Sequence, residues 1–167
     1  MANIGHFMVN WSKHPLFVFL QEPATTTKGR LESLPRGTLV FASSVRPRAA
    51  ILASADMTAW ALPDHTLPDV AACLWKTPNP SLPHIVLASV YCDINTAVIP
   101  PELIALIDYC NSSNLPFIIG ADSNSWSTLW GCPQNNSRGD EFEDFLATND
   151  IAVLNQHSWP SLGGVVG

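Results

Sequence analysis

Short apolar runs alternate with turn residues along most of this chain. The 14 prolines, together with Gly, Asn, Asp and Ser, divide the sequence into segments of strand length that are rich in apolar residues. We therefore predict seven strands, at residues 16–21, 38–43, 48–54, 70–75, 84–91, 116–121 and 151–155.

Two segments have helical periodicity instead. One helix is expected after Pro101, because proline suits a first helical turn and apolar residues then recur with helical spacing, at Leu103, Leu106, Ile107 and Cys110. A second helix is predicted over residues 138–148, with Ser137 as its N-cap and Phe142 in its buried stripe. This order of strands and helices predicts a layered α/β (α+β) fold in which sheets pack on each other with helices outside.

Composition and length describe a folded domain. Apolar residues make up 47% and charged residues 13% of 167 residues, which indicates one core-rich domain rather than a disordered segment. No apolar run approaches the roughly 18–20 residues that span a bilayer, and no secretory signal is visible at the start. We therefore expect an intracellular protein without a membrane partner. The four cysteines lack zinc-ligand spacing and are expected to be free thiols.

Charge limits how the chain can meet nucleic acid. Fourteen acidic and eight basic residues give a formal net charge of -6, which argues against DNA binding through overall charge. A DNA partner would need a cation or a local basic patch, for which Arg46, Arg48 and Arg138 are candidates, although solvated arginines are the ordinary interpretation.

Polar residues of a particular kind follow three of the most apolar predicted strands. Glu22 follows the first, Tyr91 ends another, and Asp122 and Asn124 follow a third. Rigid strand ends are where layered folds place reacting groups, and a carboxylate such as Glu22 suits Mg²⁺, which takes oxygen ligands. Each signal alone also fits a structural residue: an exposed acid, a half-buried aromatic or an Asx turn.

The order of these motifs carries a resemblance. Gln21-Glu22-Pro23, a strand-end Ser89-Val90-Tyr91 and the G-x-D-x-N element of residues 120–124 occur in sequence, and a tryptophan-glycine pair and an acidic helix follow. Over roughly residues 14–155 the chain resembles the endonuclease/exonuclease/phosphatase superfamily, and within it the apurinic-type endonuclease domain of non-LTR retrotransposons.

The resemblance implies a four-layer sandwich of two β-sheets flanked by helices that hydrolyses a DNA phosphodiester with Mg²⁺, or with Mn²⁺ as the alternative ion. By position in the motifs, it implies that Glu22 binds the metal and that Tyr91 contacts the scissile phosphate. It implies that Asp122 activates water or assists the leaving group, and that Asn124 orients Asp122 and the phosphate. It also implies target-site DNA as partner, a reverse transcriptase domain downstream in the parent element, and action in the nucleus.

Departures from the family pattern keep alternatives open. A first strand with a metal-site asparagine and a final Ser-Asp-His are expected to be missing, so residues 1–167 are interpreted as one domain that is incomplete at both ends. On this interpretation the residues before the first predicted strand correspond to the family's first helix. Trp126 stands where relatives often have histidine. The alternatives are a catalytically inactive retroelement remnant and a phosphodiesterase or phosphatase of the same superfamily with another substrate.

Overall fold

The chain divides into two compact units. The computed structural model describes residues 16–32, 34 and 36–155. Its two units are Met1–Asp122 and Ser123–Gly167, and each is described by itself.

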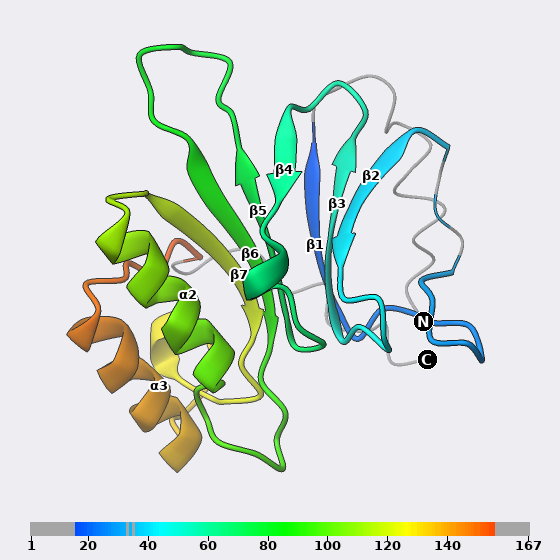
Figure 1. Cartoon of the computed structure of the whole chain (residues 1–167). Helices are drawn as coiled ribbons and strands as arrows, with labels where there is room; N and C mark the ends of the chain where they lie inside the picture. Colours follow the sequence, from blue (N-terminus) through cyan, green and yellow to red (C-terminus); the bar gives the residue numbers. More distant parts are fainter. Residues whose placement is uncertain (1–15, 33, 35, 156–167) are drawn as a thin grey trace. The chain divides into compact units, whose positions relative to one another are not determined.

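The first unit contains two β-sheets (Figure 1). The first sheet is antiparallel, with the strand order β1-β3-β2. The second has the order β4-β5-β6-β7, in which only the β6–β7 pair is parallel. The strand bounds are β1 Phe17–Gln21, β2 Thr38–Ala42, β3 Ala49–Ser54, β4 Ala59–Ala61, β5 Val70–Trp75, β6 Ile85–Tyr91 and β7 Phe117–Asp122.

The core lies between these sheets. Because side chains alternate between the two faces of a strand, one set of residues from β3 faces one set from the second sheet. The buried cluster consists of Phe41, Ala49, Ile51, Ala53, Ala71, Cys73 and Leu87. β3 is buried at every position, which explains why its sequence is a continuous apolar run rather than an alternating one.

Helix α2, Pro101–Ser112, connects β6 to the parallel strand β7. Such a crossover places the helix against the sheet, and its buried residues are the four predicted from the periodicity: Leu103, Leu106, Ile107 and Cys110. The predicted class, two packed sheets with helices, is confirmed, and within the first unit the layers are sheet, sheet and helix.

The second unit contains the 3₁₀ turn η3, Thr128–Trp130, and helix α3, Ser137–Thr148. The predicted cap was one residue late. Asn136 is the N-cap, because its side-chain oxygen accepts a hydrogen bond from the Gly139 amide at 2.8 Å. Ser137 is instead the first helical residue.

Six of the seven predicted strands are confirmed, with ends shifted by at most one residue. The strand predicted at residues 151–155 is wrong. The Ile151 amide bonds back to the Leu146 carbonyl at the end of α3, residues 152–155 pair with no strand of the described chain, and Leu154 is 81% exposed. An apolar run becomes a strand only where a neighbouring strand satisfies its backbone.

Three other elements, β4 and the two 3₁₀ turns, were not predicted, and one predicted helix cannot be compared with the structure. β4 has only three residues, as do η3 and the 3₁₀ turn η2, Pro63–His65; all three are too short for a periodicity to be visible. The helix expected before the first strand lies outside the described residues.

The four cysteines are free thiols, as predicted. Burial raises the pKa of Cys73 to about 12 and that of Cys110 to about 11. These two thiols therefore stay protonated at neutral pH and pack as small apolar groups.

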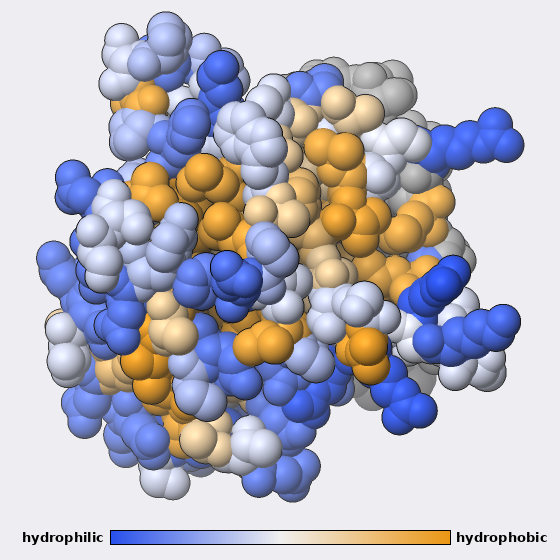
Figure 2. Space-filling view, viewed as in Figure 1, coloured by the Kyte–Doolittle hydropathy of each residue, from blue (hydrophilic) through white to orange (hydrophobic). Residues whose placement is uncertain are grey.

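Apolar residues also reach the surface. Figure 2 shows them over the three-stranded sheet, and Leu16 and Val40 are both about two-fifths exposed. Within the described residues, none of the helices has the length and apolar character needed to cross a membrane.

Candidate active site

The half-buried side chain of Gln21 and the buried side chain of Ser89 join the ends of β1, β6 and β7. The Gln21 side-chain amide donates to Ser89 Oγ at 2.9 Å and to the Gly120 carbonyl at 3.1 Å. Ser89 Oγ in turn donates to the Leu20 carbonyl at 2.9 Å. Because Ser89 is fully buried, these bonds are shielded from water, and they fix the carboxyl end of β1 against the ends of the two parallel strands.

Gly120 lets β1 and β7 approach each other closely. A Cβ atom at this position would lie 3.0 Å from both Cβ and Cγ of Phe19. An added Cβ would therefore require Phe19 to shift by a few tenths of an ångström, next to the point where the Gln21 side chain bridges the strands. The glycine of the G-x-D-x-N element therefore has a packing role, two residues before Asp122.

Tyr91 and Asp122 lie side by side at this edge. They are register partners in the parallel β6–β7 pair, and strand alternation places them on the same face as Ser89 and Gly120, toward the first sheet. Tyr91 is 8% exposed and Asp122 is half-buried. The Cys92 amide donates to the Asp122 carbonyl at 2.9 Å, so the pairing continues past the strand end.

Glu22 lies directly after β1 in an uncommon backbone conformation. Its amide donates to the Arg48 carbonyl at 2.8 Å, and its φ of 47° is in the left-handed region, which is rare for a residue before proline. The side chain is exposed, and the described residues give its carboxylate no hydrogen bond or ion pair. Such local strain is typical of functional positions.

Asn124 belongs to the second unit. Its φ is 46°, a conformation that asparagine tolerates well, and its carbonyl accepts a hydrogen bond from Arg138 Nε at 3.3 Å. The structure thus brings Glu22, Tyr91 and Asp122 to one edge of the first unit. The contact of Asn124 with Arg138 lies within the second unit.

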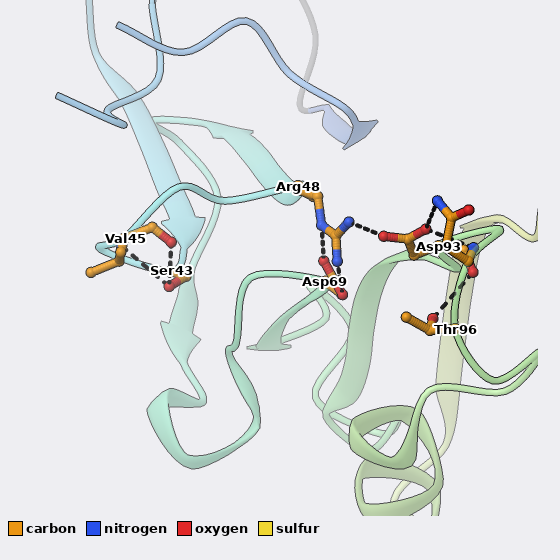
Figure 3. Close-up of polar contacts among 7 residues, drawn as sticks. Ser43, Val45, Arg48, Asp69, Asp93 and Thr96 are labelled. Atoms are coloured by element: carbon orange, nitrogen blue, oxygen red, sulfur yellow. Dashed lines mark hydrogen bonds and ion pairs between the residues drawn. The ribbon is translucent and has the colours of Figure 1, made fainter. Parts of the chain in front are cut away.

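A charged cluster of Arg48, Asp69 and Asp93 was missed by the sequence analysis (Figure 3). Arg48 Nε lies 2.5 Å from Asp69 Oδ1, a second guanidinium nitrogen lies 2.5 Å from Asp69 Oδ2, and the third bonds Asp93. The suggestion that Arg48 supplies positive charge for DNA is therefore wrong, because two carboxylates neutralise it. A signal was present: each of these residues lies next to an apolar strand, at the start of β3, the start of β5 and just past the end of β6.

This cluster predicts an acid-dependent stability. The backbone amide of Asn95 and then the Arg48 guanidinium lower the pKa of Asp93 below its ordinary value. A carboxyl whose pKa is lower in the folded state stabilises the fold above its unfolded pKa of about 3.9, and this contribution is lost as the pH falls through the folded value. In urea titrations, the stability difference between wild type and Asp93→Asn is expected to be largest near pH 6 and to shrink toward pH 3. A constant difference would contradict this.

The donor set at the strand-end edge fits a magnesium or manganese ion. Mg²⁺ is typically held by one or two carboxylates and keeps several waters, and the edge offers the Glu22 carboxylate, with Asp122 as a second acid. Among the residues that the structure describes, no three His, Cys, Asp or Glu side chains form a cluster that could hold a metal.

Comparisons with known proteins agree with the motifs. Residues 85–162 match the family model described as endonuclease-reverse transcriptase. The fold is similar to the endonuclease domain of TRAS1, a telomere-specific non-LTR retrotransposon, with a TM-score of 0.72 and 22% identity over 95% of this chain and 68% of that one. No curated protein gives a significant match. The predicted resemblance is confirmed by the family match, and the fold by the structural similarity.

Proposed function

We propose that this chain, which resembles retrotransposon endonuclease domains in motif order and fold, is a metal-dependent endonuclease that nicks DNA. The observation that carries the proposal is the convergence of Glu22, Tyr91 and Asp122 at the edge formed by β1, β6 and β7. An acid for the metal, a phenol and a second acid are the groups that phosphodiester hydrolysis needs there.

Each side chain has a proposed task. Glu22 holds Mg²⁺ or Mn²⁺, which supplies positive charge to the phosphate and its leaving oxygen when bound. Asp122 accepts a proton from the attacking water or assists departure of the leaving group. The Tyr91 hydroxyl and the Asn124 amide donate hydrogen bonds to phosphate oxygens, where negative charge develops.

The biological setting is part of the same proposal. The family description names a reverse transcriptase, and the structural neighbour is a retrotransposon endonuclease domain. We therefore propose that the chain nicks target DNA for retrotransposition, in the nucleus, with a reverse transcriptase in its parent element.

A nicking assay tests the activity. The 167-residue chain is expected to convert supercoiled plasmid to the open circle in MgCl₂ or MnCl₂, and not in EDTA. Parallel reactions with a lipid phosphodiester and a sugar phosphate test the alternative substrates of the superfamily. No nicking above the buffer control in any metal would reject the activity and favour an inactive remnant.

A basic loop next to the candidate site supplies local positive charge for DNA. Lys28 and Arg30 are exposed in a hairpin that begins two residues after Glu22. Gly29 lies between them and packs against Arg46. A Cβ added to Gly29 would lie 2.8 Å from Arg46 Cγ. We call Lys28, Arg30 and Arg46 the basic loop cluster. No ion pair to these three cations occurs in the described part of the chain.

The basic loop cluster is expected to bind DNA phosphates. Binding of a fluorescent duplex in EDTA should weaken when all three residues are changed to glutamine. The slope of log K against log salt should fall by roughly 0.9 for each phosphate that the variant no longer neutralises. Lys76→Gln is the matched control, because Lys76 is exposed at the opposite end of β5 from Asp69. Equal salt slopes for the triple variant and wild type would refute the assignment.

A further inference from the structure

Arg48 connects the two strand ends that carry Glu22 and Tyr91. Its carbonyl accepts the hydrogen bond of the Glu22 amide at 2.8 Å. Its guanidinium forms a bidentate ion pair with the Asp69 carboxylate. The Asp69 carbonyl accepts a hydrogen bond from the Tyr91 amide at 2.8 Å. One residue at the start of β3 therefore contacts the β1 end directly and the β6 end through Asp69.

The guanidinium also lies against the Tyr91 ring. Arg48 Cζ is 5.1 Å from the ring centroid, within the range of a cation–π contact. Asp69 on one side and Asp93 on the other hold the guanidinium in this position, as Figure 3 shows for the ion pairs. Because the guanidinium is planar and bound at all three nitrogens, its orientation is fixed, and the face that it offers to the ring is fixed with it.

Binding of DNA phosphate is a poor explanation for this arginine. Two carboxylates contact the guanidinium, so its positive charge is already compensated and is not available to attract a phosphate. The same carboxylates give the guanidinium a fixed geometry that a mobile phosphate-binding arginine lacks. Its contacts lead to the strand ends that carry the predicted site residues.

We propose that Arg48 is a positioning residue, which fixes the Tyr91 ring so that its hydroxyl meets the scissile phosphate. The inference rests on the proposed endonuclease function for its catalytic consequence, and on the contacts above for the placement of the ring. Lysine cannot replace Arg48, because an ammonium has neither the planar face nor the two-point geometry.

Kinetics should separate positioning from binding. Arg48→Lys and Arg48→Met are expected to lower kcat for plasmid nicking, by up to about 100-fold as for other small misplacements of reacting groups, and to leave KM for DNA within about twofold. Arg36→Lys, an exposed arginine before β2, is the control and should match wild type. A rise in KM with unchanged kcat would overturn the inference.

A spectroscopic readout tests the ring's placement without any activity. The chain has two tyrosines, Tyr91 and Tyr109, so 3-fluorotyrosine labelling gives two ¹⁹F resonances, and Tyr109→Phe assigns them. Arg48→Lys and Arg48→Met should shift the Tyr91 resonance and leave that of Tyr109 in place. An unshifted Tyr91 resonance would overturn the inference even in an active chain. A shift in a chain that does not nick DNA would reject the proposed function and retain the placement of the ring.

Discussion

Asp122→Asn is expected to lower the rate of plasmid nicking by about 100- to 10,000-fold, the range that general acid–base catalysis contributes. Asparagine preserves the size and shape of the side chain but cannot accept a proton from water. Asp122 ends β7 and is half-buried beside its register partner Tyr91, so its carboxylate is held by a rigid strand. The measurement is the initial rate of open-circle formation at saturating Mg²⁺.

The matched control for this variant is Asp108→Asn. Asp108 is exposed on α2, and its replacement should leave the rate unchanged. Circular dichroism of both variants should match wild type, which separates an effect on the chemistry from an effect on the fold. An Asp122→Asn variant that nicks within tenfold of wild type would remove Asp122 from the proposed mechanism.

Gly139→Ala is expected to destabilise α3 by about 3 kcal/mol or more, at the upper end of overpacking effects. An added Cβ would lie 1.8 Å from the Trp126 carbonyl oxygen, and both the helix start and this loop are backbone that cannot rotate away. The loop is also tied to the helix start, because the Asn136 side chain accepts the amides of Trp126 and Gly139. The variant must therefore break the cap or move the loop.

Hydrogen exchange is the suitable measurement, because the chain has two compact units and a single melting curve would mix them. Amides of α3 should lose protection in Gly139→Ala, while those of β5 and β6 retain it. Asp144→Ala, at an exposed position of the same helix, should stay within about 0.5 kcal/mol of wild type. Unchanged protection of α3 in Gly139→Ala would contradict the close approach.

The fold was predictable where strands are central and apolar. β3, β5 and β6 are buried along most or all of their length, so a continuous apolar run bounded by turn residues was sufficient. The same criterion failed at residues 151–155, where the apolar residues follow the end of α3. Apolar character predicts burial, whereas a strand also requires a partner, and pairing depends on the rest of the chain.

The residue types of the candidate site were predictable from the sequence, whereas the contacts that hold these residues in place were not. Strand-end position singled out Glu22, Tyr91 and Asp122, and the structure brings them to one edge. The ion pairs of Arg48 with Asp69 and Asp93 span 21 and 45 positions in the sequence, and no local periodicity reveals contacts of that kind. They follow from the register of β5 with β6, which places Asp69 next to Tyr91.

The Mg²⁺ dependence of plasmid nicking by wild type and Glu22→Gln tests the central claim most directly. Glutamine keeps the side-chain length and removes the charge, and even outer-shell substitutions typically weaken metal binding about 10- to 100-fold. Wild type should be inactive in EDTA and saturate with Mg²⁺, and Glu22→Gln should need at least about 10-fold more Mg²⁺ for half-maximal rate. Coincident Mg²⁺ curves for the two proteins, or nicking by wild type in EDTA, would contradict a metal-dependent site at this edge.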